Sequence, residues 1–319
     1  MSHKRSHILS VGTAVPDRIL ANKDFESFLD TTDEWITTRT GIRRRHVYEP
    51  GKAEPAFELG ARAASRALAN ARLSPSDIDG IICATFTPDY LFPSTACCIA
   101  RSLGIKGACA FDLSAACAGF VYGLSVAQSL ILSGQCRRII LVGVEIISRT
   151  LDWSDRSTAI LFGDGAGAVV IGESDDGGRG ILSTCCMSDA ALGDILTLPL
   201  WGEKRFMRMK GSEVFKHAVR MMGNVVVKAL AHSGLSCGDV DVFIPHQANM
   251  RIIISLAAHL GIPLEKVVTN LDEYGNTSSA SIPLALEDAW KSGRIRDGSV
   301  VAFTALGGGV AYGSAVVRF

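Results

Sequence analysis

The chain has 319 residues, of which 48% are hydrophobic, and its 32 Lys+Arg balance its 32 Asp+Glu, so the formal net charge is +0. This length and apolar content allow one large domain or two smaller ones, each with a sizeable core. The zero net charge excludes a global electrostatic attraction to nucleic acid or membranes, so an acidic partner has to meet a local basic patch.

In chain order, strand and helix patterns alternate. They predict a strand at 8–11, helices at 22–29, 31–38 and 58–71, a strand at 78–85, a helix at 95–103, a strand at 108–111, a helix from Cys117 to 132, and a strand at 138–144. Such alternation is typical of an α/β protein.

Cys117 follows a predicted buried strand and precedes an apolar helical pattern that ends at Ser133-Gly134, a helix stop signal. Taken alone, a cysteine is most simply a small buried hydrophobe. We nevertheless expect Cys117 in the first turn of a helix, where unpaired amides and the helix dipole depress a thiol pKa. Its small neighbours leave room for a substrate carbonyl, so the pattern predicts a nucleophile that attacks thioesters.

An internal repeat relates the two halves of the chain. Residues 67–79 match residues 229–241, and Cys117 and Asn276 each lie 17 residues before the glycine that ends a helix (134 − 117 = 293 − 276). His246 follows the strand predicted at 240–244, and catalytic groups gather at such strand ends. We therefore predict halves at 1–175 and 176–319, packed so that Cys117, His246 and Asn276 converge.

His246 and Asn276 also have simpler interpretations. Alone, His246 would be a hydrogen-bonded structural residue and Asn276 a helix N-cap. Their placement by the repeat favours catalytic roles. His246 would donate to an oxyanion as neutral imidazole or act as a base, and Asn276 would donate to a substrate carboxylate or enolate.

Two glycine-rich runs invite different interpretations. The run 162–168 contains a G-x-G-x-G pattern, but a strand-like Val169-Val-Ile follows it, whereas a dinucleotide fingerprint opens a helix. We therefore interpret it as close backbone packing. The run Gly307 to Gly309 predicts a turn that can aim a backbone N–H at an oxyanion.

Trp35 precedes a cluster of arginines that includes Arg39, Arg43 and Arg45. One interpretation is a solvated basic turn. The other is a nucleotide clamp, in which Trp35 and Arg39 stack on a base and nearby cations meet phosphates. No set of His, Cys, Asp and Glu has metal-ligand spacing, so we predict no metal.

Three features of the sequence bear on the cellular compartment. The nine cysteines show no C-x-x-C spacing and lie mostly in apolar segments, which fits a reducing cytosol. After the polar residues 1–7, only the run from Ile8 to Val11 precedes the first glycine, and this run is too short for a signal-peptide core. The uncharged stretch 299–317 contains three consecutive glycines and predicts strand, turn and strand rather than a membrane helix. We expect a cytoplasmic protein with no membrane and no nucleic-acid partner.

Over nearly its whole length the sequence resembles the β-ketoacyl-acyl carrier protein synthase III family, whose members start fatty acid synthesis. The motifs that carry the resemblance are Thr32-Asp-Glu-Trp-Ile, Arg39-Thr-Gly-Ile, Ala115-Ala-Cys-Ala-Gly-Phe, Asp155-Arg, Phe162-Gly-Asp-Gly-Ala-Gly-Ala, Pro245-His-Gln-Ala-Asn, Tyr274-Gly-Asn-Thr-Ser and Gly307-Gly-Gly. The resemblance implies a thiolase-like fold in which two duplicated βαβα-type halves form an αβαβα sandwich.

The resemblance also implies the chemistry. Cys117 would take an acyl group, usually acetyl, from coenzyme A, and His246 and Asn276 would stabilise the enolate formed as malonyl-acyl carrier protein loses carbon dioxide. Attack of the carbanion on acyl-Cys117 would give a 3-oxoacyl-acyl carrier protein. The backbone amides of Cys117 and Gly308 would form the oxyanion hole. No cofactor is implied beyond the coenzyme A thioester as substrate.

Binding roles follow from the same resemblance. Coenzyme A would be held at its adenine and phosphates by Trp35, Arg39, Thr40 and Arg156, and along its pantetheine by Gly211, Phe215, Ala248 and Asn249. The acyl carrier protein would dock on Lys216 and Arg251. Phe92 would enter the acyl pocket of a partner subunit, which implies a homodimer.

Several alternatives stay open. A related condensing enzyme could use another starter to make a secondary metabolite or signal. A thiolase proper would need a second cysteine, which the C-terminal glycine region does not offer. A nucleotide-dependent oxidoreductase would rest on the run 162–168, and a non-catalytic binding module would leave the filled positions of Cys117, His246 and Asn276 unexplained.

Overall fold

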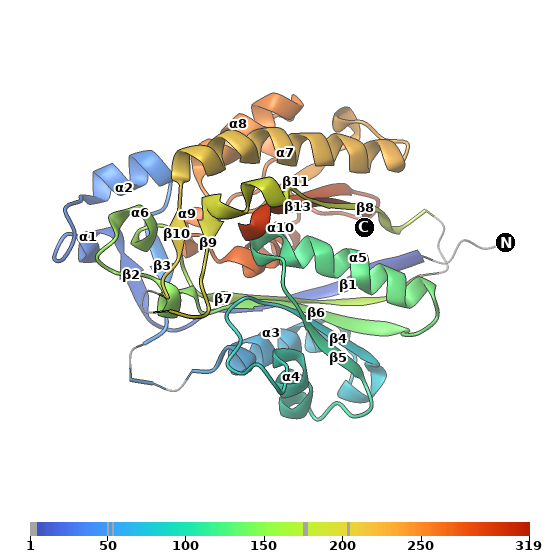
Figure 1. Ribbon diagram of the computed structural model, residues 1–319. Helices are drawn as coiled ribbons and strands as arrows, with labels where there is room; N and C mark the ends of the chain where they lie inside the picture. Colours follow the sequence, from blue (N-terminus) through green and yellow to red (C-terminus); the bar gives the residue numbers. More distant parts are fainter. Residues whose placement is uncertain (1–4, 50, 53, 175–177, 203–204) are drawn as a thin grey trace.

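The structure is a computed structural model that describes residues 5–49, 51–52, 54–174, 178–202 and 205–319. Figure 1 shows two β-sheets with helices between them and helices on both outer faces. Helices α7 and α8 cover one sheet, α3 and α4 cover the other, and α5 and α10 lie in the middle layer. The αβαβα order predicted for the duplicated chain is therefore confirmed.

The first sheet has the strand order β1-β7-β6-β4-β5. Strand β4 pairs in parallel with β5 and β6, while β7 pairs antiparallel with β6 and β1. Every residue of β4 is buried, as expected of a parallel strand covered on both faces. The strands are β1 Arg5–Ala14, β4 Gly80–Ala84, β5 Cys109–Leu113, β6 Arg138–Glu145 and β7 Gly165–Ser174.

The second sheet repeats this arrangement with one strand fewer, in the order β11-β12-β13-β8. Strand β11 is parallel to β12, and β13 is antiparallel to both of its neighbours. The position that β5 holds in the first sheet is reduced here to a single parallel bridge between Phe243 and Val267. The strands are β8 Gly180–Ser188, β11 Val242–Pro245, β12 Val300–Leu306 and β13 Ala311–Arg318.

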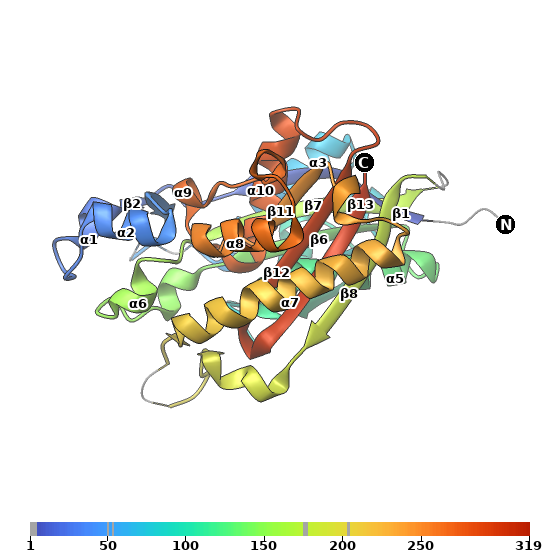
Figure 2. The same cartoon turned by 90° about the horizontal axis from the view of Figure 1, so that it is seen from above.

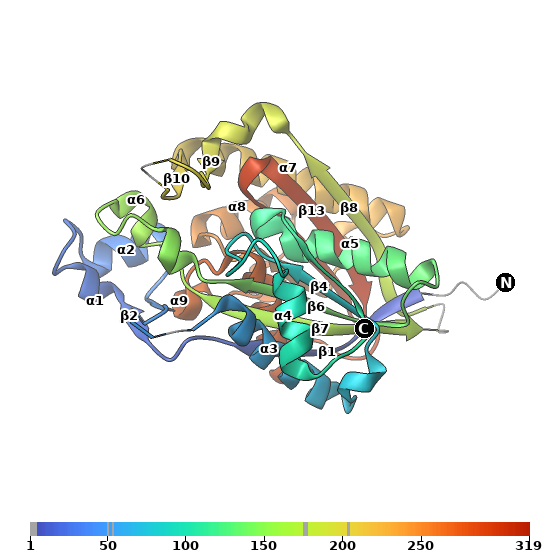
Figure 3. The ribbon, with the colours of Figure 1, turned by 60° about the horizontal axis from the view of Figure 1, so that its bottom comes forward.

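The long helices are duplicated as well. Figure 2 shows α7 lying across the second sheet, and Figure 3 shows α3 and α4 over the first. These helices are α3 Ala56–Ala71, α4 Thr95–Leu103, α5 Gly119–Leu132, α7 Gly211–His232, α8 Met250–Leu260 and α10 Ser281–Lys291. None of the helices in the described part of the chain combines the length and the apolar character needed to cross a membrane.

Short elements form a lobe at one end of the sandwich, seen on the left of Figure 1. The antiparallel pair of β2 and β3 lies there with α1, α2 and α6, and α9 packs on β3. Two further short strands, β9 and β10, pair with each other. The bounds are β2 Ile19–Ala21, α1 Asn22–Phe25, α2 Asp33–Thr40, β3 Arg44–His46, α6 Arg156–Ala159, β9 Leu196–Thr197, β10 Arg208–Met209 and α9 Leu271–Tyr274.

Some predicted bounds were wrong for local reasons. The helix predicted at 31–38 runs from Asp33 to Thr40, because the Thr32 hydroxyl caps it by accepting from the Trp35 amide and Gly41 ends it with a left-handed φ of 82°. The helix predicted at 22–29 has helical residues only at Asn22–Phe25, and two backbone bonds to the Phe25 carbonyl close the turn that follows.

The two halves share a core. One cluster of buried side chains includes Ile8 and Phe120 from the first half and Phe303 from the second. The predicted boundary between residues 175 and 176 lies outside the described residues. The division into halves at that point stays a prediction.

Candidate active site

Cys117 lies in a 3₁₀ turn, Ala116–Ala118, between β5 and α5. The prediction that it occupies the first turn of the α-helix is therefore wrong by a short distance, because α5 begins at Gly119. Ala116 has a left-handed φ of 46°, unusual for a residue with a side chain. Gly307 packs on this turn so closely that a Cβ there would lie 2.6 Å from the Cys117 nitrogen.

A cavity of about 1300 Å³ opens in front of this turn. Cys117 and Gly308, the two residues predicted to form the oxyanion hole, both line this cavity. The wall is largely apolar, with Phe162, Leu196, Leu198 and Met207 among its residues. A cavity of this kind beside a buried thiol suits an acyl chain.

The pKa of Cys117 corrects a prediction. We expected the helix start to depress it, but burial raises the pKa of the thiol to about 12. The Ser278 hydroxyl beside the sulfur lowers the pKa, and the nearby carboxyl of Glu145 raises it. Loss of hydration therefore outweighs the Ser278 hydroxyl and the Cys117 backbone amide, which both lower the pKa.

His246 directly follows β11, as predicted, and is buried. Its Nδ1 lies 2.6 Å from the hydroxyl oxygen of Ser281, the first residue of α10. Burial lowers the pKa of His246 to about 3, so the imidazole is neutral at physiological pH. The Ser281 oxygen also accepts from the Gln247 amide at 3.4 Å. When the Ser281 hydroxyl donates to Nδ1, the proton of the neutral imidazole lies on Nε2.

Asn276 lies at the start of the segment that links all three candidates. Its Oδ1 accepts from the Ser278 amide at 2.9 Å, so its Nδ2 remains a donor. Its backbone pairs with Phe162, a residue of the cavity wall. Ser278 also lies beside the Cys117 sulfur, and Ser281 contacts His246. The segment 276–281 therefore brings the predicted trio together, although His246 and Asn276 are not among the described residues that line the cavity.

Glu145, at the end of β6, lies fully buried next to this segment. It accepts hydrogen bonds from the hydroxyls of Thr87 at 2.7 Å and Ser279 at 3.2 Å. Burial raises the pKa of its carboxyl to about 8, and these hydrogen bonds lower it. Glu145 thus connects the second-half segment with the loop after β4.

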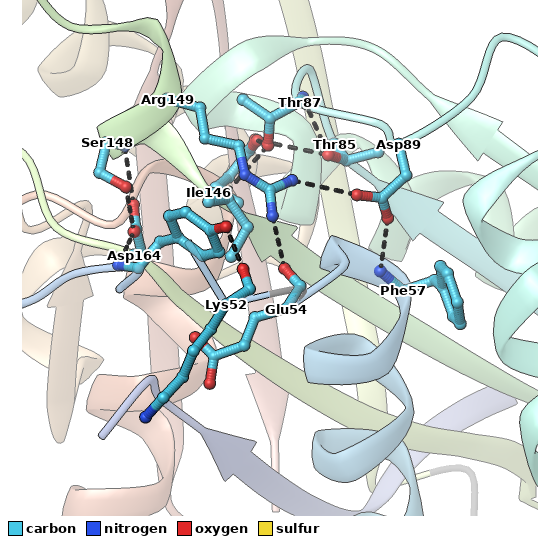
Figure 4. Close-up of polar contacts among 12 residues, drawn as sticks. Lys52, Glu54, Phe57, Thr85, Thr87, Asp89, Ile146, Ser148, Arg149 and Asp164 are labelled. Atoms are coloured by element: carbon cyan, nitrogen blue, oxygen red, sulfur yellow. Dashed lines mark hydrogen bonds and ion pairs between the residues drawn. The ribbon is translucent and has the colours of Figure 1, made fainter. Parts of the chain in front are cut away.

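That loop comprises residues 85–93, of which 85–91 line the cavity. It is anchored through the carboxylate of Asp89. Figure 4 shows Arg149 reaching to Asp89, with 3.1 Å between Nη1 and Oδ1, and to the Glu54 carbonyl at 2.6 Å. The other oxygen of Asp89 accepts from the Phe57 amide at 3.0 Å. These anchors leave the loop tip outside, and the side chain of Phe92 is 87% exposed.

The predicted nucleotide clamp is assembled in the lobe. Trp35 lies against two guanidinium groups, with the Cζ atoms of Arg39 and of Arg156 each 4.5 Å from its ring centroid. Arg39 comes from α2 and Arg156 from the first position of α6. The same aromatic face and cations that the sequence associates with a base and phosphates therefore lie together.

The other predicted coenzyme A residues are placed less uniformly. Asn249 caps α8 and donates from Nδ2 to the Arg39 carbonyl at 3.3 Å, which ties it, with the adjacent Ala248, to the clamp helix. Thr40 is buried, and its hydroxyl donates to the Ile36 carbonyl and accepts from the Ile42 amide, so it ends α2. Gly211 and Phe215 lie in the first turns of α7. The ligand roles of these residues stay predictions.

The predicted docking residues, Lys216 and Arg251, are both exposed and lie on neighbouring helices, α7 and α8. Arg251 donates to the Thr38 carbonyl at 3.4 Å. In the described part of the chain, no group of three or more His, Cys, Asp or Glu is placed to hold a metal ion.

Sequence analysis missed the residues that support the trio. Ser278 and Ser281 stand in a run of hydroxyl residues after Asn276, more of them than one helix cap uses. Glu145 is an acidic residue at the end of an otherwise apolar strand. Both signals were visible, but the partners of these residues are distant in the chain: Cys117 for Ser278, His246 for Ser281, and Thr87 and Ser279 for Glu145.

Two family models and several known proteins are similar to this chain. The family model 3-Oxoacyl-[acyl-carrier-protein (ACP)] synthase III matches residues 111–190, and the model of its C-terminal part matches residues 230–319. A β-ketoacyl-[acyl-carrier-protein] synthase III from Oleidesulfovibrio alaskensis is 46% identical over 98% of this chain and 99% of its own.

Solved structures are similar over the whole fold. The 3-oxoacyl-[acyl-carrier-protein] synthase III from Aquifex aeolicus VF5 has a TM-score of 0.94 and 45% identity, covering 98% of this chain and 100% of that one. The priming β-ketosynthase of the R1128 polyketide pathway has a TM-score of 0.93 and 37% identity, covering 100% of this chain and 98% of that one. The predicted thiolase-like fold, on which such synthases are built, is thereby confirmed.

Proposed function

The chain belongs to the 3-oxoacyl-[acyl-carrier-protein] synthase III family, and from this premise we propose how its residues perform the reaction of the family. It is an acyltransferase that condenses an acyl-coenzyme A starter with malonyl-acyl carrier protein to give a 3-oxoacyl-acyl carrier protein. The observation that carries the residue assignments is the segment 276–281, which contacts both Cys117 and His246 and begins with Asn276.

In the first half-reaction, Cys117 attacks the thioester of the starter. Because burial holds the thiol pKa at about 12, the sulfur loses its proton as the coenzyme A thiolate departs and takes one up. The backbone amides of Cys117 and Gly308 stabilise the oxyanion of the tetrahedral intermediate. The acyl chain then occupies the apolar cavity that both residues line.

In the second half-reaction, His246 and Asn276 act as paired donors. The Nε2 proton of neutral His246 and the Nδ2 amide of Asn276 bind the malonyl thioester oxygen, and the charge of the enolate develops there as carbon dioxide leaves. A neutral imidazole suits this role when Nδ1 accepts from the Ser281 hydroxyl, because its one proton then lies on Nε2. The carbanion then attacks the carbonyl of acyl-Cys117 and expels the Cys117 thiolate, which takes up a proton from water to restore the thiol.

Coenzyme A is the substrate that the clamp fits, and no further cofactor is required. Trp35 would receive the adenine between Arg39 and Arg156, whose guanidinium groups also face the phosphates. The acyl carrier protein, an acidic partner, would meet the exposed Lys216 and Arg251. A homodimer is supported by the exposed tip of the 85–93 loop, where Phe92 is free to enter the cavity of a second copy. The nine free cysteines support a reducing, cytoplasmic location.

A panel of acyl-coenzyme A donors tests this proposal. We expect acetyl-coenzyme A to label Cys117 at a rate that supports turnover with malonyl-acyl carrier protein, with the label located by mass spectrometry. Labelling by a longer or branched donor but not by acetyl would favour the alternative of a specialised condensing enzyme. Absence of any label on Cys117 would overturn the assignment of the nucleophile.

A further inference from the structure

Arg45 does not belong to a solvated basic turn, which was one interpretation of the arginine cluster after Trp35. Its side chain is completely buried, and its guanidinium lies 4.7 Å from the ring centroid of Phe25. Burial lowers its pKa to about 9, and the carboxylates of Asp24 and Asp33 act against that shift. A buried cation is unfavourable unless its donors are satisfied, so the contacts of Arg45 identify what it holds.

The guanidinium of Arg45 reaches two parts of the lobe at once. Its Nη2 donates to the carbonyl of Ile160, the residue that ends α6, at 2.6 Å. Its Nη1 donates to the side-chain oxygen of Asn22 at 2.9 Å and to the Leu20 carbonyl at 3.2 Å. One side chain therefore connects the end of α6 with strand β2 and the start of α1.

Asn22 extends this connection to α2. Its amide donates to Oδ1 of Asp33, the first residue of α2, at 2.9 Å and to the carbonyl of Ile42, just beyond the end of α2, at 2.7 Å. Asn22 is itself buried, so these bonds are protected from water. Arg45 and Asn22 together form a hydrogen-bonded chain from α6 to both ends of α2.

These two helices carry the clamp. Trp35 and Arg39 come from α2, whereas Arg156 comes from α6, a helix of only four residues. The Arg39 and Arg156 guanidinium groups both lie against the Trp35 ring. Their spacing therefore depends on how α2 and α6 are held relative to each other. We propose that Arg45 is a positioning residue that sets this spacing and thereby governs binding of the nucleotide end of acyl-coenzyme A.

This inference rests on the proposed function, since it takes coenzyme A as the ligand of the clamp. It predicts an effect confined to substrates that carry the nucleotide. Acyl-pantetheine presents the same thioester without adenine or phosphates, and malonyl-acyl carrier protein also lacks the adenine. A residue needed only for overall folding would affect all three substrates.

The variants are Arg45→Met, Arg45→Lys, Trp35→Ala and the matched control Arg44→Met. Methionine keeps the unbranched stem of Arg45, whose Cβ packs near Gly163 and Gly275, and removes only the guanidinium. Lysine keeps the charge but has one donor nitrogen, which cannot bond Ile160 and Asn22 as a planar fork does. Arg44 is the exposed neighbour that pairs with Glu273.

Steady-state kinetics with acyl-coenzyme A and acyl-pantetheine, using the acyl group that labels Cys117, decides the matter. We expect Arg45→Met to raise the KM for acyl-coenzyme A about tenfold, with kcat and the KM values for acyl-pantetheine and malonyl-acyl carrier protein changed less than about twofold. Arg45→Lys should show the same selective rise, smaller in size, and Arg44→Met none.

Equal KM increases for acyl-coenzyme A and acyl-pantetheine in Arg45→Met would overturn the positioning role. If Arg45→Met is too unstable to assay, Arg45→Lys decides in the same way, since it must still separate the two substrates. Trp35→Ala distinguishes this failure from failure of the proposed function. If Trp35→Ala leaves the KM for acyl-coenzyme A unchanged, the clamp itself is wrong, whereas a selective rise in Trp35→Ala but not in the Arg45 variants refutes only the role of Arg45.

Discussion

The starts of helices α5 and α10 occupy equivalent places in the duplicated chain, yet they are built differently. The helices end at equivalent residues, Leu132 and Lys291, which are offset by the same 159 residues as Cys117 and Asn276 (291 − 132 = 276 − 117). Helix α5 begins at Gly119, whose equivalent is residue 278, but α10 begins only at Ser281. Each helix is preceded by a three-residue 3₁₀ turn whose first residue has a left-handed φ, Ala116–Ala118 (φ 46° at Ala116) and Ser278–Ala280 (φ 51° at Ser278), so the turn lies three positions later in the second half (278 − 116 = 162, against 159).

This difference gives the two starts different chemical characters. The first start is apolar and leaves the Cys117 sulfur without water, which raises its pKa. The second start carries serine hydroxyls that reach the Cys117 sulfur, Glu145 and His246. A duplicated backbone therefore supplies a nucleophile from one half and hydrogen-bond donors from the other, and the two 3₁₀ turns are where the halves meet.

Replacing the nucleophile tests the first start and should have the largest effect. We expect Cys117→Ala to lower condensation at least about 10⁴-fold, because no other group forms the acyl-enzyme. Loss of the acyl label in mass spectrometry should accompany it. The control is Cys97→Ala, which removes an exposed cysteine and should leave turnover unchanged. Condensation that persists in Cys117→Ala would refute the comparison at its centre.

Replacing the donors tests the second start. We expect His246→Ala and Asn276→Ala each to lower release of carbon dioxide from malonyl-acyl carrier protein by about 10²- to 10⁴-fold, while acylation of Cys117 remains measurable. Because the folded-state pKa of His246 is lowered to about 3, the imidazole stays neutral above that pH, and the wild-type decarboxylation rate should show no inflection near pH 6.5. Loss of acylation alone would contradict the division of roles.

Much of this arrangement was predictable from local sequence. The alternating apolar patterns predicted most strands of both sheets, although not β8. Equal spacing to a helix-ending glycine predicted that Cys117 and Asn276 are equivalent, which holds for the ends of α5 and α10 but is three residues off at the turns that precede them. His246 followed from the register of the same repeat. These features depend on periodicity and on residues close together in the chain, which sequence displays directly.

What could not be predicted depends on contacts between segments that are far apart in the chain. The raised pKa of Cys117 arises because the segment 276–281 and Gly307 cover it, and neither is near it in sequence. Arg45 looked like part of an exposed basic turn, but strand β2, α1 and the end of α6 enclose it. Desolvation by distant segments reversed the expectation in both places.

The contact between the halves includes the buried carboxyl of Glu145, whose ionisation destabilises the folded protein. Its pKa is about 8 in the folded protein and near 4.5 when unfolded, so the folded state favours the protonated form. Between these values the unfolded state ionises first, and stability falls as pH rises from about 5 to 8. Glu145→Gln should remove this fall, so that its free energy of unfolding, relative to wild type, improves by up to a few kcal/mol over that range.

Urea unfolding of both proteins at several pH values measures this difference. Asp164, whose pKa burial raises to about 6, titrates in wild type and variant alike, so it cancels in the comparison. Arg137→Gln is a control for loss of a charged group at an exposed position just before the same strand, β6. A relative stability of Glu145→Gln that is flat with pH would show that the carboxyl is ionised in the folded protein.

The smallest expected effect concerns the hydroxyl that links the two starts. Ser278 lowers the Cys117 pKa against the larger effect of burial, so Ser278→Ala should raise that pKa further. Since the thiolate fraction falls about tenfold for each unit of pKa, alkylation of Cys117 by iodoacetamide should slow several-fold at a fixed pH between 7 and 9. The exposed Cys97 serves as an internal control and should react equally in both proteins. Faster alkylation of Cys117 in Ser278→Ala would mean that the serine shields the sulfur rather than stabilising its anion, and the second start would then contribute donors only to the malonyl substrate.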